Sequence, residues 1–198
     1  MTTAQAEKIT NEIMDLYAGY GGNEYAGEKV TQLEHMVQAA QLAEEQGYDE
    51  EVILAALLHD IGHISEAAKG DESEEMSASR RMDGFGIKDH EELGAEFLKG
   101  KGFSKKIVRL VESHVEAKRY LTATDPAYYA GLSEASKRTL EYQGGPMTQE
   151  EAEAFTQYPL FPLIIQMRKW DELAKIEHKP LPDLQHYRGM ILHHLSHS

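Results

Sequence analysis

The sequence contains no cysteine and no long apolar run, and each absence excludes a class of protein. Without cysteine there are no disulfides and no thiolate ligands, so any bound metal must be held by nitrogen and oxygen atoms. No stretch of 18 apolar residues is present, which argues against a membrane-spanning helix. The polar N-terminal segment lacks the pattern of a signal peptide. These features predict a cytoplasmic protein.

Positive charge is also scarce. The 198 residues include 20 Lys and Arg against 34 Asp and Glu, which gives a formal net charge of −14. Such an acidic surface repels nucleic acids and anionic lipids, so we expect neither a nucleic acid nor a membrane as partner. An anionic substrate would therefore need a few local cationic side chains that act against the overall field. The length is typical of one domain.

Apolar residues recur at spacings of three and four through most of the chain, which predicts an all-α fold, a single helical bundle over residues 1–198. Candidate helix N-caps occur along this pattern at Asp49, Ser104, Ser133 and the Thr148–Glu151 capping box. The clearest predicted helices are residues 5–20, 30–46, 52–64, 89–100, 104–119 and 160–176.

Two regions interrupt the helical pattern. Residues 65–88 are polar and contain an acidic run, Asp71–Glu75, so we interpret them as a long loop or a loosely helical insertion. We place the catalytic core at about residues 10–176 and treat 177–198 as a C-terminal tail. Although the end of this tail is compatible with a helix, its polar, histidine-containing composition favours a mobile segment.

The sequence HDIGH at residues 59–63 is the strongest sign of chemistry. His59 and His63 are four residues apart, and Asp60 and His63 are three apart, so on one helix the three side chains can converge on one side. A single histidine on an apolar helix face is more often a core residue than a ligand. Five histidines in predicted helices or at their ends shift the balance towards a metal site; they are His35, His59, His63, His90 and His114.

Two further helices combine a metal-binding type of residue with a cation. His114 and Lys118 are four residues apart, and Arg168 and Asp171 are three apart. Each spacing places both side chains on the same face of a helix. A metal beside Lys and Arg is suited to a substrate that carries a phosphate or phosphonate group.

The order of His35, His59-Asp60 and Asp171 resembles the HD-domain superfamily, whose ligands follow the pattern H…HD…D. His90 and His114 match the subset that holds two metals with six protein ligands. The resemblance therefore implies that these six residues are metal ligands, with Asp60 bridging the two metals.

Longer stretches resemble a narrower group, the mixed-valent di-iron oxygenases that cleave 1-hydroxyphosphonates. This resemblance covers roughly residues 10–176 and rests on five stretches, NEYAGEKVTQLEH, LLHDIGH, ESHVEAKRYL, LSEASKRTLEYQGGPM and MRKWDELAK. It implies two iron ions in an Fe(II)/Fe(III) state, O2 as co-substrate and a small hydroxyphosphonate as substrate.

The same resemblance implies roles for six further residues. Tyr25 and Glu28 match a pair that closes over the resting site and moves away when the substrate binds. The residues that match those binding the phosphonate oxygens are His63, Lys118, Ser136 and Arg168. From residue types alone, Lys118 and Arg168 could instead form ion pairs at the surface, and Ser136 could be an ordinary hydroxyl at the end of a helix.

Two other functions are compatible with an HD pattern. One is a metal-dependent phosphohydrolase that acts on a nucleotide or phosphate monoester, and the other is an inactive signalling module. Every ligand position is filled, which argues against the inactive module. Within the oxygenase interpretation, the acidic insertion and Met76 favour an N-trimethylated substrate that yields glycine betaine over the free amine that yields glycine. The sequence does not indicate an oligomeric state.

Overall fold

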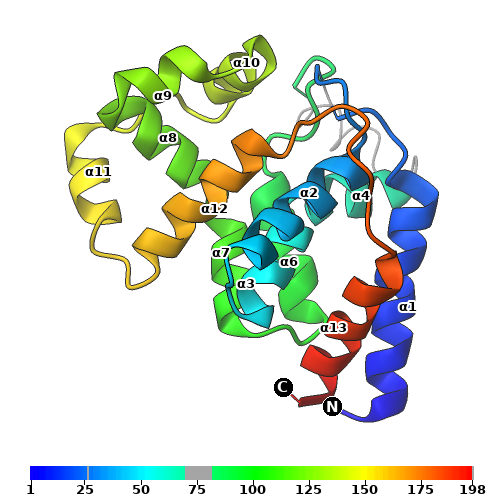
Figure 1. Ribbon diagram of the computed structural model, residues 1–198. Helices are drawn as coiled ribbons and strands as arrows, with labels where there is room; N and C mark the ends of the chain where they lie inside the picture. The colour runs from blue at the N-terminus through cyan, green and yellow to red at the C-terminus, as the bar shows by residue number, and fades with distance from the viewer. Residues whose placement is uncertain (26, 70–81, 198) are drawn as a thin grey trace.

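The computed structural model describes residues 1–25, 27–69 and 82–197, and this part of the chain is helical with no named strand (Figure 1). The prediction of an all-α fold is confirmed. The acidic run at Asp71–Glu75 and Met76 lie outside the described residues. In the described part, no helix is long and apolar enough to span a membrane.

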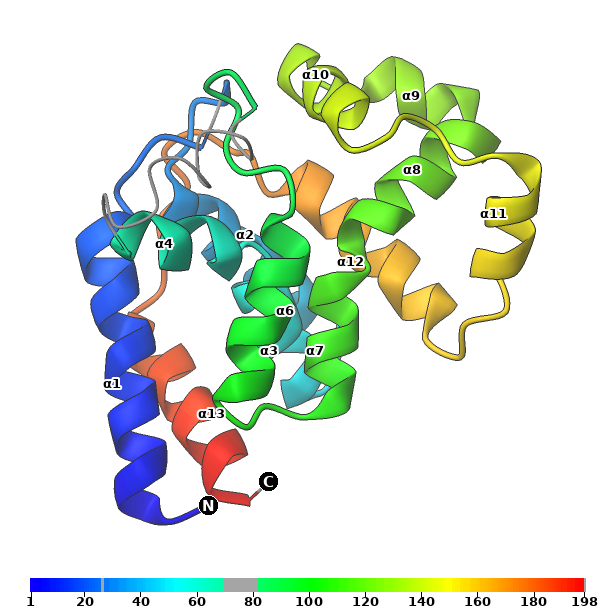
Figure 2. The same cartoon turned by 180° about the vertical axis from the view of Figure 1, so that it is seen from behind.

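The central helices carry most of the candidate site residues. α2 (Gln32–Glu45) packs against α3 (Glu50–Leu58), α3 packs against α7 (Lys105–Glu112), and α4 (Ile61–Ala68) packs against α6 (His90–Gly100). Figure 2 shows α6 and α7 side by side on the far surface of this bundle. α12 (Phe161–Leu173) contacts both α2 and α8 (His114–Thr124), and so connects the bundle to the rest of the chain.

Three short helices follow α8 and extend away from the bundle (Figure 1). They are α9 (Pro126–Gly131), α10 (Glu134–Tyr142) and α11 (Gln149–Phe155). The predicted caps at their N-termini are present: Ser133 accepts a hydrogen bond from the backbone N–H of Ser136, and Thr148 forms a capping box with Glu151. These caps satisfy backbone N–H groups that have no partner within the helix.

The predicted helix over residues 52–64 is wrong, because the chain bends within HDIGH. α3 ends at Leu58, and Asp60 adopts φ −103° and ψ 14° before α4 begins at Ile61. The residues between the two helices, His59 and Asp60, are neither proline nor glycine, and Gly62 lies inside α4, so tertiary packing rather than a helix-breaking residue produces the bend. The predicted helix 104–119 is likewise divided at Ser113, between α7 and α8. Both bends place a candidate ligand next to the end of a helix.

The C-terminal region is not a mobile tail. Residues Leu184–His197 form α13, which lies beside α1 (Thr3–Tyr20) at the end of the molecule where both termini meet (Figure 1). Tyr187, Ile191 and Leu195 are buried at successive intervals of four residues. This apolar stripe supplies the burial that stabilises the helix, and the polar histidines between its members obscured it in the sequence.

Gly62 determines how closely α4 can approach α6. A Cβ atom at Gly62 would lie 2.0 Å from the carbonyl oxygen of His90, and backbone atoms cannot yield as a flexible side chain can. We expect Gly62→Ala to lower the free energy of unfolding by about 3 kcal/mol, at the upper end of overpacking costs. Urea denaturation monitored by circular dichroism measures this change.

Gly19→Ala is the matched control. Gly19 lies in α1, and a Cβ atom there would meet nothing within 4 Å. Alanine favours a helix over glycine by up to about 1 kcal/mol, so this variant should equal or exceed the wild type in stability. Equal stabilities for Gly62→Ala and the wild type would contradict the close approach of α4 and α6.

Candidate metal centre

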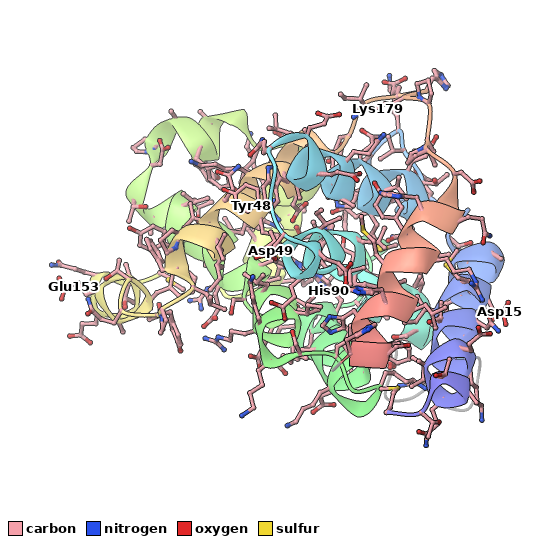
Figure 3. All side chains as sticks on the ribbon, turned by 60° about the horizontal axis from the view of Figure 1, so that its bottom comes forward. Asp15, Tyr48, Asp49, His90, Glu153 and Lys179 are labelled. Atoms are coloured by element: carbon pink, nitrogen blue, oxygen red, sulfur yellow. The ribbon has the colours of Figure 1, made fainter. Side chains whose placement is uncertain are left out.

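Two buried groups of nitrogen and oxygen ligands face one another in the bundle. The first group consists of His35 from α2, His59 at the bend and Asp171 from α12; the second consists of Asp60, His90 and His114. Within each group, one ligand atom from every residue lies within 4.8 Å of the others. All six residues predicted as metal ligands are therefore brought together, and Figure 3 shows His90 in the interior, whereas Asp15 and Glu153 lie at the edge of the molecule.

The four histidines are all oriented in the same way. Each Nδ1 lies 2.7–2.9 Å from a backbone carbonyl oxygen, those of Ala174, Ala56, Ile87 and Val111 for His35, His59, His90 and His114 respectively. Because a carbonyl only accepts hydrogen bonds, each Nδ1 must carry the proton, and in a neutral ring Nε2 then has a free lone pair. Such contacts fix the tautomer and orientation of metal-binding histidines.

The free lone pairs point at one another. The Nε2 atoms of His35 and His59 are 3.0 Å apart, and those of His90 and His114 are also 3.0 Å apart. Two lone pairs at this distance repel unless a proton or a metal cation lies between them. Burial lowers the pKa of His59, but the Asp60 carboxylate outweighs burial and raises it to about 9. Each pair is therefore arranged to hold a positive charge.

Asp60 lies between the two pairs. Its Oδ2 is 3.5 Å from His35 Nε2 and 3.4 Å from His59 Nε2, and its Oδ1 is 3.2 Å from His90 Nε2 and 3.4 Å from His114 Nε2. Although burial alone raises the pKa of Asp60, the surrounding histidines outweigh it and hold the pKa well below its usual range. The ionised carboxylate thus presents one oxygen to each ligand group, which is the geometry of a bridging ligand.

The Asp171 carboxylate also indicates that the two ligand groups are suited to metal ions. Its Oδ1 is buried, has no hydrogen-bond partner among the described residues, and lies 3.3 Å from His35 Nε2. A buried carboxylate oxygen left without a partner is costly, and a cation would satisfy it. Imidazole nitrogen and carboxylate oxygen suit iron, manganese and zinc. The residues present therefore fit two metal ions.

His63 belongs to neither ligand group, so it does not join His59 and Asp60 as their helical spacing had allowed. Its ring stacks on His90 with centroids 4.0 Å apart, and its Nδ1 accepts a hydrogen bond from the N–H of Ile87 at 3.3 Å. Burial, reinforced by the neighbouring His90, lowers the pKa of His63 to about 3. The bend between α3 and α4 separates it from His59, and it lines the cavity beside the ligand groups.

Cationic and hydroxyl side chains gather on the other side of this cavity. We call Lys118, Ser136, Arg168 and Lys175 the donor cluster, since all four line the cavity together with Asp60 and Asp171. Lys118 is only 3% exposed, and Arg168 only 5%. They are not surface residues, and the local positive charge expected for an anionic substrate is present.

Lys118 has neutral oxygen partners. Its Nζ donates to Thr139 Oγ1 in α10 at 2.5 Å and to Oε1 of Gln143, the residue that follows α10, at 3.1 Å. Burial, followed by repulsion from Arg168, holds the pKa of Lys118 well below its usual range. An anion in the cavity would favour the charged form of this side chain.

Arg168 is held by acidic partners. One guanidinium nitrogen contacts Asp171 Oδ2, another contacts Glu172 Oε1, and Nε donates to the Tyr128 hydroxyl at 2.7 Å. Burial raises the pKa of Asp171, but the guanidinium outweighs it and holds that pKa well below its usual range. Arg168 therefore connects a candidate ligand with the donor cluster.

Tyr25 and Glu28 belong to the segment that precedes α2. The Tyr25 ring stacks on His35 with centroids 3.9 Å apart. Glu28 Oε1 accepts hydrogen bonds from Ser133 Oγ at 2.6 Å and Lys175 Nζ at 3.0 Å. Both residues line the cavity, so this segment closes one side of the site.

The sequence did not reveal several residues of the site. Lys175 is four residues after Asp171, and Gln32 is three before His35, so helical spacing was an available signal for both. Glu172 is four residues after Arg168, so the same signal was available for it, whereas no local signal identified Met82 or the contacts that Thr139 and Gln143 make with Lys118. The cavity has a volume of about 50 Å³, which is smaller than a typical ligand site.

Known proteins resemble this chain over most of its length. The family model described as HD domain matches residues 33–152. A 1-hydroxy-2-(trimethylamino)ethylphosphonate dioxygenase (glycine-betaine-forming) of Leisingera caerulea is 45% identical over 183 residues, which cover 92% of this chain and 88% of that protein. A hydroxymethylphosphonate dioxygenase of Gimesia maris is 38% identical over 198 residues, which cover 100% of this chain and 93% of that protein.

A third relative, an uncharacterized protein of Acanthamoeba polyphaga mimivirus, is 43% identical over 188 residues, which cover 95% of this chain and 82% of that protein. The helical fold, the two ligand groups and the matching family model define the class, and the chain belongs to the HD-domain family. Within that family its relatives of named activity are dioxygenases, enzymes of the oxidoreductase class that act on hydroxyphosphonates.

Proposed function

We propose that this protein is a di-iron oxygenase that uses O2 to cleave the C–P bond of a 1-hydroxyphosphonate. The observation that carries the proposal is the carboxylate of Asp60, which faces two histidine pairs next to a buried donor cluster. The two relatives of named activity are dioxygenases of hydroxyphosphonates, which favours this function over the phosphohydrolase considered from the sequence. We assign the whole chain to one HD domain.

In this proposal His35, His59 and Asp171 would hold one iron, His90 and His114 would hold the other, and Asp60 would be shared between them. The active form holds Fe(II) and Fe(III). The iron pair supplies the activation of O2 and the exchange of electrons, which the protein side chains alone do not offer. With Asp60 shared, the first iron would also have Asp171, whereas the second would have no further carboxylate among the described residues. This difference in ligand charge is consistent with unequal oxidation states.

The donor cluster binds the phosphonate. Lys118 and Arg168 supply charge, Ser136 supplies a hydroxyl donor, and the neutral His63 ring borders the same cavity. These contacts orient the C1–H bond towards the ligand groups and stabilise charge on the phosphorus oxygens as the C–P bond breaks. The reaction balances as R–CH(OH)–PO3H2 + O2 giving R–COOH + H3PO4.

Access of the substrate requires the site to open. A cavity of about 50 Å³ holds little more than water, so the stacked Tyr25 and the Glu28 segment must move to admit a hydroxyphosphonate. Tyr25 therefore acts as a lid over the first ligand group, and the bonds of Glu28 to Ser133 and Lys175 keep the lid closed.

We propose the N-trimethylated hydroxyphosphonate as the preferred substrate, with glycine betaine and phosphate as products. Tyr25, Met82 and Phe85 line the cavity and offer aromatic and sulfur-containing surface. Such surface suits a quaternary ammonium group, which attracts aromatic rings and has no N–H to satisfy. The relative from Leisingera caerulea is named for this reaction.

Phosphate release by the iron-loaded protein tests the function. We expect phosphate to appear only when O2 is present, with the initial rate highest on the trimethylated substrate and lower on the free amine and on hydroxymethylphosphonate. Release under strict anaerobiosis would contradict the oxygenase, and equal rates on all three would contradict the substrate preference. Partly oxidised protein should show a mixed-valence electron paramagnetic resonance signal that shifts when the substrate is added.

A further inference from the structure

Glu172 places a carboxylate among the groups expected to bind the phosphonate. It lies on α12 directly after Asp171, and its side chain is 17% exposed. Oε1 contacts a guanidinium nitrogen of Arg168 and accepts a hydrogen bond from Ser136 Oγ at 3.2 Å. Oε2 lies 3.3 Å from Lys175 Nζ. One internal anion therefore engages three of the four members of the donor cluster.

These contacts are of the kind that a phosphonate makes. A guanidinium, an ammonium and a hydroxyl are the usual donors to phosphorus oxygens, and a carboxylate accepts the same bonds in a similar geometry. Lys175 Nζ also donates a hydrogen bond to Ser136 Oγ at 3.3 Å, so these two donors remain together when a phosphonate replaces the carboxylate. A phosphonate that binds here must displace Glu172 from them.

We propose that Glu172 is an internal anion that occupies the phosphonate site until the substrate displaces it, and so sets the affinity of that site. The inference rests on the proposed function only in taking the donor cluster as the phosphonate site. Competition of this kind keeps the buried cations paired when no substrate is bound, because an unpaired buried charge is costly. It also weakens the binding of small anions that cannot offer further contacts.

Inorganic phosphate is the probe, because it carries the anionic group without requiring turnover. Isothermal titration of the metal-loaded protein should give a Kd about tenfold lower for Glu172→Gln than for the wild type, since the substitution removes a like charge next to the bound anion. Glu177→Gln is the matched control: Glu177 pairs with the exposed Lys29 at 3.1 Å and should leave the Kd unchanged. An unchanged or higher Kd for Glu172→Gln would overturn the inference.

A second variant distinguishes competition by Glu172 from a general loss of folded structure. Glu172→Asp keeps the charge but is one methylene shorter and cannot reach all three donors, so its Kd for phosphate should fall severalfold; an unchanged or higher Kd would overturn the inference. In turnover, Glu172→Gln should lower KM with little change in kcat, whereas a purely structural role would lower the melting temperature and kcat instead. If the protein does not cleave the C–P bond, the proposed function is rejected. The phosphate titration would still test whether Glu172 competes with a bound anion.

Discussion

Replacing Asp60 by Asn is expected to abolish the activity and to reduce the bound metal from two ions per chain to one or none. Asparagine keeps the size of the side chain but removes the charge that both histidine pairs face at 3.2–3.5 Å. We expect kcat/KM to fall at least about 1,000-fold, which corresponds to about 4 kcal/mol of transition-state stabilisation. Metal analysis of the purified protein and oxygen-dependent phosphate release measure the two effects.

Asp15→Asn is the control for this experiment. Asp15 is exposed on α1, at the edge of the molecule in Figure 3, and the same change of charge there should alter neither metal content nor rate. Two metal ions in Asp60→Asn at the wild-type level would show that Asp60 is not the bridging ligand.

The second large effect is expected at Arg168. Arg168→Met removes the guanidinium from the donor cluster, and we expect KM for the hydroxyphosphonate to rise about 100-fold, near 3 kcal/mol, as for the loss of charge-assisted hydrogen bonds. Arg168→Lys keeps the charge without the planar fork and should lose less. The measurement is the steady-state rate of phosphate release as a function of substrate concentration.

Arg168→Met should also destabilise the fold, because Asp171 loses its guanidinium partner and Glu172 loses one of its two cations. Breaking a buried ion pair costs about 3–5 kcal/mol, so the melting temperature must be measured beside KM. Arg188→Met serves as the control, since among the described residues Arg188 donates to the exposed Asn11 in α1, and it does not line the cavity. A KM for Arg168→Met equal to that of the control would exclude Arg168 from phosphonate binding.

Local features of the fold were predictable because they depend on neighbours in sequence. Asp49, Ser104, Ser133 and Thr148 cap helices as expected, since a cap requires only a side-chain oxygen and an N–H a few residues later. The stripe of Tyr187, Ile191 and Leu195 was equally local, and the error about the C-terminal tail came from giving the polar histidines more weight than this spacing.

The two bends were not predictable in this way. Residues 52–64 have an unbroken apolar pattern up to Leu58, and nothing in their composition ends a helix at His59. Gly62 against the backbone of His90 indicates the reason, because α4 must turn to pack on α6 at this short distance. Helical spacing therefore placed His63 beside His59, whereas packing placed it against His90.

The sequence by itself determined the chemistry available to this protein: nitrogen and oxygen ligands without thiolates, helical segments, and cations next to candidate ligands at spacings of three and four residues. Tertiary structure alone decided that Asp60 faces both histidine pairs, that Tyr25 covers His35, and that Glu172 reaches Ser136. The physical reason is that helical periodicity relates residues within a few turns, whereas these contacts join α2, α4, α6, α8, α10 and α12, whose relative positions depend on packing of the whole core.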